Sequence, residues 1–323
     1  MHKSIIIGAG ARGLVWAKAL QQHPEFQLVG IVDPNSALLA ERGDALAMAK
    51  ELRHERMEDA IPGAQAAFVV VPHHLHYPVA RQVLEAGLHC LVEKPFTLLE
   101  AEAKELVELA ASKNLVLQVA QNYRLKPVCL FVEKVLREQR LGRLCAVQAS
   151  FHRNRPPRQE HEARMPWPLL YTQVIHHLDW LTVILPAPIA EVASFHSSPP
   201  WSGWENPSVC QISLRCEDDT LVSYSGSYEA RGEASSYSGS WRFECERGDL
   251  HIGNPTDTVW EVTENGASRT ELFTDAGKAT EQILLSDLHR GIVDGIEPPT
   301  SGRRNLETMA LLFRVMQNGP AHH

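Results

Sequence analysis

The sequence predicts an α/β protein of two domains: a doubly wound parallel sheet, and then an α+β domain with a large, open, mainly antiparallel sheet. Three observations lead to this prediction. In residues 1–122, short apolar runs alternate with helical patterns, as in parallel sheets covered by helices. The first apolar run enters a glycine-rich turn and then a helix. From Ile189 to Phe273, apolar and polar residues alternate, which is typical of antiparallel strands with one buried face. We therefore expect domains at 1–122 and 123–323.

Composition limits the classes of protein to which the chain can belong. Its 323 residues are 44% hydrophobic and 22% charged, as expected of a globular protein with a sizeable core. The formal net charge of −8 argues against a nucleic acid or an anionic membrane as the main partner. No apolar run approaches the roughly 18 residues that a membrane-spanning helix needs. The N-terminus shows no signal-peptide pattern and the cysteines form no C-x-x-C pair, so we expect reduced cysteines in a cytoplasmic protein.

The glycine-rich turn is Gly8-Ala9-Gly10-Ala11-Arg12-Gly13, which fits the pattern G-x-G-x-x-G. It follows the apolar run 5–7 and opens a helical pattern. In such a turn the glycines permit a tight bend, close approach of a pyrophosphate and close packing of helix on strand, and the helix N-terminus offers free N–H groups to the phosphates. A second strand over 27–32 ends at Asp33, where a carboxylate can accept hydrogen bonds from adenosine ribose hydroxyls. These features predict a Rossmann-type dinucleotide-binding domain.

The rest of the first domain continues the alternation of strands and helices. Residues 67–71 form a continuous apolar run, as expected of a strand that is buried on both faces. Gly87 is placed to end one helix, and Thr97 with Glu100 forms a capping-box pattern that can start another. We expect helices over 37–49, 78–86 and 98–111, and strands over 67–71, 88–92 and 115–119.

The strand over 88–92 delivers Glu93, Lys94 and Pro95 to its carboxyl end. In an open parallel sheet, ligands bind in the crevice outside this end of the strands. The proline also restricts the backbone of Lys94, because it disfavours the helical region for the residue before it. A solvated loop with a surface ion pair is the alternative interpretation. The glycine turn and Asp33 favour a functional role for the segment.

Three sequence features resemble the family of glucose–fructose oxidoreductase, inositol dehydrogenase and MocA proteins (Gfo/Idh/MocA). They are the glycine turn with Asp33, the segment Val71-Pro72-His73-x-x-His76 followed by Ala86-Gly87-Leu88-His89, and Glu93-Lys94-Pro95. The resemblance implies that His73 and Glu93 lie along a nicotinamide cofactor and that Lys94 faces the nicotinamide. It also implies that the Lys94–Pro95 peptide bond can be cis, as it often is in the family.

The ligands expected for the first domain are organic rather than metallic. We expect NAD to be preferred over NADP, because Asp33 would repel a 2′-phosphate, although Arg12 lies near enough in sequence to weaken the preference. His74, His76 and His89 have no acidic or cysteine ligand at a familiar metal spacing, so we expect no metal. The residues that we expect to bind the cofactor are Gly8, Gly10, Arg12, Gly13, Asp33, Pro72, His73, His76, Glu93 and Lys94.

The second domain starts with elements of mixed type. We expect helices over 127–138 and 169–185, a strand over 145–151, then the alternating strands, and finally helices over 279–293 and 303–317. Residues 152–158 form a basic, turn-rich stretch that includes Arg153. It is either a solvated loop or a lip over the substrate that holds a carboxylate or phosphate, because arginine pairs with such groups bidentately.

The helix over 169–185 carries the second group of candidate site residues. Thr172, His176 and Asp179 share one stripe of an ideal helix, whereas His177 shares a side with Gln173. His176-x-x-Asp179 resembles the family motif, which usually reads Asp-x-x-x-His-x-x-Asp, but Thr172 stands where the first aspartate normally is. Thr172-Gln173 instead resembles the Asn-Gln or similar pair of a subgroup found among sugar and nucleotide-sugar 3-dehydrogenases. The departure leaves His176 without the carboxylate that would assist it.

The resemblance implies an oxidoreductase that transfers a hydride between the nicotinamide and a secondary alcohol or ketone of a sugar, a sugar derivative or a cyclic polyol. A neutral histidine suits proton transfer near pH 7, so His176 is the candidate base. Lys94 would stabilise the negative charge that develops on the substrate oxygen. The expected substrate-binding residues are Tyr123, Arg153, Thr172, Gln173 and His176.

Two alternative functions remain open at the level of sequence. Some relatives use NAD transiently to oxidise a sugar, eliminate the glycosidic bond and reduce the product, which makes them glycosidases. Regulatory members keep the fold as ligand sensors without turnover, and the presence of both Lys94 and His176 counts against that alternative. Family members usually pair their C-terminal sheets, so the resemblance also implies a homodimer or homotetramer through this sheet.

Overall fold

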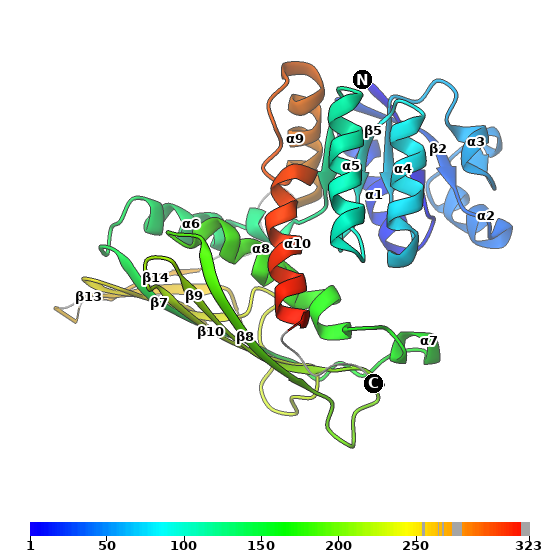
Figure 1. The fold of residues 1–323 in the computed structure, drawn as a ribbon. Helices are drawn as coiled ribbons and strands as arrows, with labels where there is room; N and C mark the ends of the chain where they lie inside the picture. Colours follow the sequence, from blue (N-terminus) through cyan, green and yellow to red (C-terminus); the bar gives the residue numbers. More distant parts are fainter. Residues whose placement is uncertain (254–255, 264, 267, 273–279, 318–323) are drawn as a thin grey trace. The chain divides into compact units, whose positions relative to one another are not determined.

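The computed structural model describes residues 1–253, 256–263, 265–266, 268–272 and 280–317 (Figure 1). The chain forms two compact units. The first unit comprises Met1–Asn122 and Lys278–Met309, and the second comprises Tyr123–Gly277 and Ala310–His323. The sequence pattern assigned every residue after 122 to the second domain, whereas the structure groups the segment Lys278–Met309 with the first unit. None of the helices in the described part of the chain is long and apolar enough to cross a membrane.

The first unit is built on a six-stranded parallel sheet with the order β3-β2-β1-β4-β5-β6. Its strands are β1 (His2–Ile7), β2 (Phe26–Val32), β3 (Arg53–His54), β4 (Ala66–Val69), β5 (His89–Val92) and β6 (Leu117–Val119). The order reverses direction at β1, as in a doubly wound sheet. The predicted parallel sheet is confirmed. The edge strand β3 was missed, because two residues are too short to produce a pattern.

Helices flank this sheet. They are α1 (Ala11–Gln22), α2 (Ser36–Ala45), α3 (Met57–Ala60), α4 (His76–Glu85), α5 (Glu100–Ser112) and α9 (Thr280–Asp294), with 3₁₀ turns η1 (Lys50–Leu52) and η2 (His73–Leu75). The helices α4 and α5 lie side by side (Figure 1). α9 packs beside α1, where the Gln282 side chain donates to the Ala19 carbonyl at 2.9 Å. Gly87 and Gly295 follow α4 and α9 with φ of 82° and 68°, a backbone region that glycine enters without strain.

The start of α5 differs from the sequence prediction. The helix begins at Glu100, and the Leu99 N–H donates to the Glu102 carboxylate at 3.2 Å. Thr97 does not cap it; its hydroxyl instead donates to the Leu99 carbonyl at 2.8 Å. The capping pattern that begins at Thr97 therefore does not mark the N-terminus of this helix, because the chain makes a further turn before the helix starts.

The second unit contains an eight-stranded sheet with the order β14-β13-β12-β11-β7-β10-β9-β8. Its strands are β7 (Leu144–His152), β8 (Ile189–Ser197), β9 (Val209–Cys216), β10 (Leu221–Ser227), β11 (Ser240–Cys245), β12 (Gly248–Gly253), β13 (Thr258–Thr263) and β14 (Ser268–Leu272). β7 and β10 pair in parallel and the other neighbours pair antiparallel. The predicted mainly antiparallel sheet is confirmed.

One face of this sheet is covered and the other is open. The helices of the unit are α6 (Pro127–Arg137), α7 (Glu160–Ala163), α8 (Ile175–Ile184) and α10 (Gly302–Gln317, of which the residues after Met309 belong here), with the 3₁₀ turn η3 (Tyr123–Leu125) and the π-helical turn η4 (Leu170–Val174). Trp180 of α8 packs on Trp241 and Phe243 of β11, with ring centroids 4.9 and 5.7 Å apart. Along β9 and β11, buried apolar residues alternate with more exposed polar ones, as the period of two predicts.

Two further sequence expectations have different outcomes: one falls partly on residues that the structure does not describe, and the other predicted one helix where the structure has two helical segments. Phe273 and Ala279, which bounded the expected strands and the expected helix 279–293, lie outside the described residues. The single helix predicted over 169–185 is instead a π-helical turn, Leu170–Val174, followed by α8. A π turn places more residues in one turn than an α-helix does, so it shifts the phase of every side chain before it.

Candidate functional site

The glycine turn forms a cradle at the carboxyl end of β1. Gly8 has φ of 107°, and a Cβ atom there would lie 2.3 Å from the Val70 carbonyl oxygen. A Cβ atom on Gly13 would lie 2.0 Å from the Gly8 oxygen, so both positions require glycine for close packing. Gly10 is different, because a Cβ atom there would meet no heavy atom within 4 Å. The middle glycine therefore faces open space at the N-terminus of α1, which fits the pyrophosphate of a dinucleotide.

Asp33 lies at the carboxyl end of β2 and holds the glycine turn. One carboxylate oxygen accepts a hydrogen bond from the Ala9 N–H at 2.8 Å, and the other accepts one from the Asn35 N–H at 2.9 Å. The two backbone donors fix the carboxylate beside the turn. This is the position from which an acid can reach adenosine ribose hydroxyls.

Glu93, which is buried, is the centre of a polar cluster after β5. One of its carboxylate oxygens accepts hydrogen bonds from Arg12 Nε at 2.8 Å and from Trp16 Nε1 at 2.9 Å. Arg12 also pairs with Glu281 at 3.1 Å, so two carboxylates engage its guanidinium. These contacts argue against the expectation that Arg12 weakens discrimination against a 2′-phosphate. Trp16 and Glu281 were not predicted as neighbours, because they are distant from Glu93 in sequence.

Lys94 follows this cluster directly, and its backbone N–H donates to the second Glu93 oxygen at 3.2 Å. The Lys94–Pro95 peptide bond is cis, as the resemblance implied. The Pro95 carbonyl contacts the buried imidazole of His76 at 2.6 Å, and the other ring nitrogen of His76 contacts the Val71 carbonyl at 3.0 Å. His76 therefore ties the segment after β4 to the segment after β5.

His73 lies in the 3₁₀ turn that begins after Pro72. Burial, with smaller contributions from His76, Lys94 and His74, lowers the pKa of His73 to about 3. The imidazole is consequently neutral at pH 7. The structure thus brings the ten predicted cofactor residues to the carboxyl ends of β1, β2, β4 and β5, with Pro72 and His73 in the β4 connection and Arg12 in the first turn of α1.

In the second unit, the ring of His176 stacks on Tyr123. Their centroids are 3.8 Å apart and their planes differ by 8°. The ammonium of Lys126 lies 3.8 Å from the same Tyr123 centroid, and it must occupy the opposite face because the imidazole covers the first. Lys126 also donates to the Ser238 hydroxyl at 3.2 Å. Tyr123 and His176 were both predicted site residues; Lys126 was missed, because its role depends on a stacking contact that no local pattern reveals.

His177 has a different environment from its neighbour. It is buried and its Nδ1 contacts the Tyr224 hydroxyl at 2.8 Å. Its Nε2 contacts the Gln173 amide at 3.2 Å and the Tyr237 carbonyl at 3.1 Å. Burial lowers the pKa of His177 to about 3, although the hydrogen bond to Tyr237 opposes this shift. The contact with Gln173 agrees with the predicted i, i+4 spacing, and it makes His177 part of a packed network.

Thr172, His176 and Asp179, the residues of the predicted stripe, each contact residues outside it. Asp179 forms a buried, bidentate ion pair with Arg124 at 2.6 and 2.8 Å. The Thr172 hydroxyl accepts a hydrogen bond from Arg155 at 2.9 Å and lies 2.6 Å from the Tyr228 hydroxyl. The π-helical turn contains Thr172, so the α-helical phase that aligned the three residues does not apply to it.

Arg153 and Gln173 meet at one loop residue. The Arg153 guanidinium lies over the Tyr237 ring, 4.4 Å from its centroid, and the Gln173 amide donates to the Tyr237 carbonyl at 2.9 Å. The predicted substrate residues of this unit therefore form three local groups: Tyr123 with His176, Gln173 with Arg153 around Tyr237, and Thr172 with Arg155 and Tyr228. Arg155, Tyr228 and Tyr237 were not predicted.

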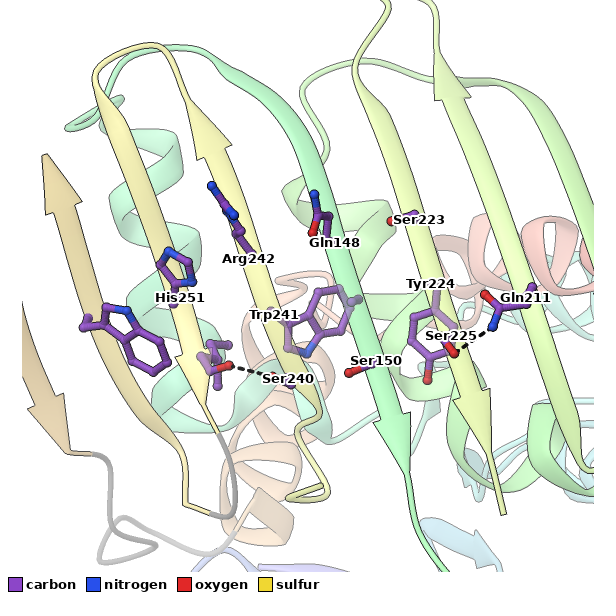
Figure 2. Close-up of a pocket in the computed structure, with 13 residues that line it drawn as sticks. Gln148, Ser150, Gln211, Ser223, Tyr224, Ser225, Ser240, Trp241, Arg242 and His251 are labelled. Carbon is purple, nitrogen blue, oxygen red and sulfur yellow. Dashed lines mark hydrogen bonds between the residues drawn. The ribbon is translucent and has the colours of Figure 1, made fainter. Parts of the chain in front are cut away.

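The open face of the eight-stranded sheet carries a shallow hollow of about 400 Å³ (Figure 2). Arg242 and His251 extend from adjacent strands along its rim, and Gln211 donates to the Ser225 hydroxyl at 2.9 Å. None of the predicted site residues lines it. Within the described ranges, no group of three or more histidine, cysteine or acidic side chains could hold a metal ion.

Solved structures share this architecture over almost the whole chain. An oxidoreductase from Agrobacterium radiobacter, in complex with NAD⁺, L-tartaric acid and magnesium, superposes with a TM-score of 0.88 at 19% identity, covering 98% of this chain and 96% of that one. The WlbA dehydrogenase from Bordetella pertussis, in complex with NADH and UDP-GlcNAcA, gives 0.81 at 21% identity, covering 98% and 96%. At such identities the similarity shows the fold.

Two sequence relatives with higher identity match over shorter segments. An uncharacterized oxidoreductase of Schizosaccharomyces pombe is 29% identical over 204 residues, which cover 60% of this chain and 54% of that protein. The UDP-N-acetylglucosamine 3-dehydrogenase of Acidithiobacillus ferrooxidans is 33% identical over 111 residues, which cover 33% and 34%. The matched segments therefore span about half or less of the relatives' own length.

Family profiles match both parts of the chain. The profile described as "Oxidoreductase family, NAD-binding Rossmann fold" matches residues 2–121. The profile described as "GFO/IDH/MocA C-terminal domain" matches residues 130–251. These matches agree with the parallel sheet, the glycine turn and the open mainly antiparallel sheet described above. The chain belongs to the Gfo/Idh/MocA oxidoreductase family.

Proposed function

We propose that this protein is an NAD-dependent oxidoreductase that acts on a secondary alcohol or ketone of a sugar, a sugar derivative or a cyclic polyol. The observation that carries the proposal is the cradle around Gly10: a Cβ atom there would meet open space, while Asp33 is fixed beside the turn by the Ala9 N–H. The carbohydrate part rests on relatives, since one matched protein is a UDP-N-acetylglucosamine 3-dehydrogenase and one similar structure contains UDP-GlcNAcA.

The proposed chemistry assigns one role to each of two side chains. When bound, the nicotinamide supplies the hydride acceptor or donor. His176 takes the hydroxyl proton in oxidation and returns it in reduction, with its ring orientation held by the stack on Tyr123. Lys94 donates a hydrogen bond to the substrate oxygen and stabilises its negative charge. His177 is not the base in this proposal, because both of its ring nitrogens already contact polar atoms of the core.

Titration with NADH and NADPH tests the cofactor part. Asp33 should favour NADH, because its carboxylate accepts from ribose hydroxyls and repels a 2′-phosphate. The replacement Asp33→Ser should reduce the discrimination. Binding is measured by the nicotinamide fluorescence, which needs no substrate. Tighter binding of NADPH than of NADH by the unmodified protein would contradict the assignment of Asp33.

A substrate panel tests the reaction itself. Neutral sugars, uronic acids, sugar phosphates, nucleotide sugars and cyclic polyols are each incubated with NAD⁺, and reduction is followed at the nicotinamide absorbance. We expect one class to be oxidised. The corresponding ketones are tested for reduction with NADH. If NADH binds but no alcohol of the panel is oxidised and no corresponding ketone is reduced, the proposed redox activity is wrong.

We also propose that the protein pairs with a second copy through the open face of the eight-stranded sheet. Phe195 pairs with Gln211 across the sheet, so both lie on this face, and Phe195 is 77% exposed. Leu221 is also exposed, and it alternates with the buried Val222. Large exposed apolar side chains on a broad face are typical of interaction surfaces. Light scattering should give a dimer or tetramer, and Phe195→Glu should weaken it.

A further inference from the structure

Arg153 is held in place by a ring and by backbone rather than by an acidic partner. Its guanidinium lies 4.4 Å from the centroid of the Tyr237 ring, and its Nη1 donates to the Ser235 carbonyl at 2.5 Å. Ser235 is itself fixed to the end of β7, because it exchanges hydrogen bonds with the His152 backbone at 2.8 and 3.0 Å. The position of the positive charge is therefore set by the fold.

Arg155, two residues further on, shows the contrast. Its guanidinium donates to Thr172 and Tyr228 and pairs with the Glu162 carboxylate at 3.3 Å. Arg153 forms no ion pair with any side chain that the structure describes; the undescribed side chains are those of 161, 254–255, 264, 267–279 and 318–323. Glu229, on the loop that carries Tyr237, instead accepts from the hydroxyls of Ser202 and Ser208 at 2.6 and 2.7 Å. No acidic side chain described there neutralises Arg153.

A guanidinium stacked on an aromatic ring keeps its N–H edge available. The ring contacts one flat face, while the donors point outward in the plane, in the geometry that pairs bidentately with a carboxylate or a phosphate. Nη1 of Arg153 is used by Ser235, and Nε and Nη2 have no acceptor within the part of the chain that the structure describes. This side chain is half-buried, so a fixed anion there would be screened less than at an exposed arginine.

Tyr237 links this charge to the candidate base. Its ring carries Arg153, and its backbone carbonyl contacts both Gln173 at 2.9 Å and His177 at 3.1 Å. His177 is adjacent to His176 in α8. The guanidinium therefore lies on the same local framework as the helix that bears the proposed proton acceptor.

We propose that Arg153 binds an anionic group of the substrate, a carboxylate or a phosphate, so that the enzyme acts on an acidic sugar rather than on a neutral one. This inference rests on the proposed function, because it names the class of substrate. The chemistry shared by the two anions is a pair of oxygens that accept from the Nε and Nη2 edge of one guanidinium.

Matched sugars test the charge directly. Glucose, galactose and mannose are compared with their uronic acids and their 6-phosphates for binding to the NADH-loaded, full-length protein by calorimetry. In at least one series we expect the uronic acid or the 6-phosphate to bind at least about tenfold more tightly than the neutral sugar. Tighter binding of the uronic acid identifies a carboxylate, and tighter binding of the 6-phosphate identifies a phosphate.

Three variants assign the effect to Arg153. Arg153→Gln should abolish the preference for the acid, and Arg153→Lys, which keeps the charge without the planar fork, should retain part of it. Arg158→Gln is the matched control, because it removes the same charge from an exposed position in the same stretch and should leave the preference unchanged. Thermal unfolding of each variant shows whether Arg153→Gln remains folded, and Arg153→Lys keeps the test available if it does not.

The outcomes separate this inference from the proposed function. If NADH does not bind, the proposed function fails. If NADH binds but neither acid binds more tightly than its neutral sugar in any series, or no acid binds at all, the anion site is wrong while the cofactor assignment stands. A preference that Arg153→Gln and Arg158→Gln reduce equally would also overturn the inference, because it would reflect general charge rather than Arg153.

Discussion

Lys94 carries the clearest expectation at the scale of single residues. Its backbone is held by Glu93, which is in turn held by Arg12 and Trp16, so a change of its side chain should leave the surrounding cluster in place. Lys94→Met keeps the length of the side chain and removes its hydrogen-bonding charge. We expect NADH binding to be retained and kcat to fall by much more than tenfold. A loss within about tenfold, equivalent to roughly 1.4 kcal/mol, would show that Lys94 does not stabilise the substrate oxygen.

His176 and His177 provide a matched pair of substitutions. His176→Asn should lower kcat by about 10²–10⁴-fold, the usual cost of losing a general base, with NADH affinity little changed. His177→Asn removes a side chain that contacts Tyr224 and Tyr237, so it should mainly lower the thermal stability. The two variants are compared by kcat and by unfolding temperature. If His177→Asn lowered kcat and His176→Asn lowered mainly the stability, the assignment of the proton transfer to His176 would be wrong.

The residues that sequence could identify differ from those that it could not. Gly8, Gly10, Gly13 and Asp33 were found because the turn and the strand after it impose fixed local spacings. The stack of Tyr123 on His176 joins residues that are distant in sequence, and no periodicity encodes it. The same holds for the pairing of Arg12 with Glu93 and Glu281.

At the scale of elements, the strands were predictable and the irregular turns were not. A buried parallel strand is a continuous apolar run, and in a half-buried antiparallel strand apolar and polar residues alternate. Both therefore leave a signal in the order of the residues along the sequence. The π-helical turn Leu170–Val174 leaves none, because its sequence is as apolar as the α-helix that follows it. This turn contains Thr172, whose hydroxyl contacts Arg155 and Tyr228.

The glycine turn between β1 and α1 predicts how a methyl group at Gly10 should affect NADH binding. Gly10→Ala places its methyl group in open space, so the fold should be kept, while the methyl group occupies the region expected for the pyrophosphate. We expect NADH affinity to fall by at least about tenfold. Gly8→Ala is the contrasting variant: its methyl group would lie 2.3 Å from the Val70 oxygen, and it should lower the unfolding temperature. Equal NADH affinity of Gly10→Ala and the unmodified protein would contradict the cradle.

At the scale of the whole molecule, the first unit is not one continuous stretch of the chain, because a segment near the C-terminus returns to it. The amphipathic pattern of 279–293 predicts a helix with one buried face, but it does not say which sheet covers that face. The structure groups Lys278–Met309 with the first unit, where Gln282 contacts Ala19 and Asn122 contacts Thr280 at 3.0 Å. Such a return depends on long-range packing, which periodicity cannot specify.

Buried histidines make the stability of the molecule depend on pH. Burial lowers the pKa of His73 and of His177 to about 3, and it also lowers the pKa of His2, His76 and His89. His73 and His177 are therefore neutral in the folded chain in mild acid, whereas in the unfolded chain they bind a proton below about pH 6.5. The unfolded state therefore binds more protons in mild acid, and the free energy of unfolding falls as the pH falls.

The last prediction isolates His177, which lies among the rings of Trp241 and Tyr224. With a folded pKa of about 3 and an unfolded one near 6.5, it alone should lower the free energy of unfolding by about 2 kcal/mol between pH 7 and pH 5. Urea titrations followed by tryptophan fluorescence measure this in the second unit, which contains every tryptophan except Trp16. His177→Gln should lose less stability on acidification than the unmodified protein, whereas the same change at the exposed His74 should not alter the acid loss. If His177→Gln showed the full acid loss, the imidazole would not be the neutral, buried group that its contacts indicate.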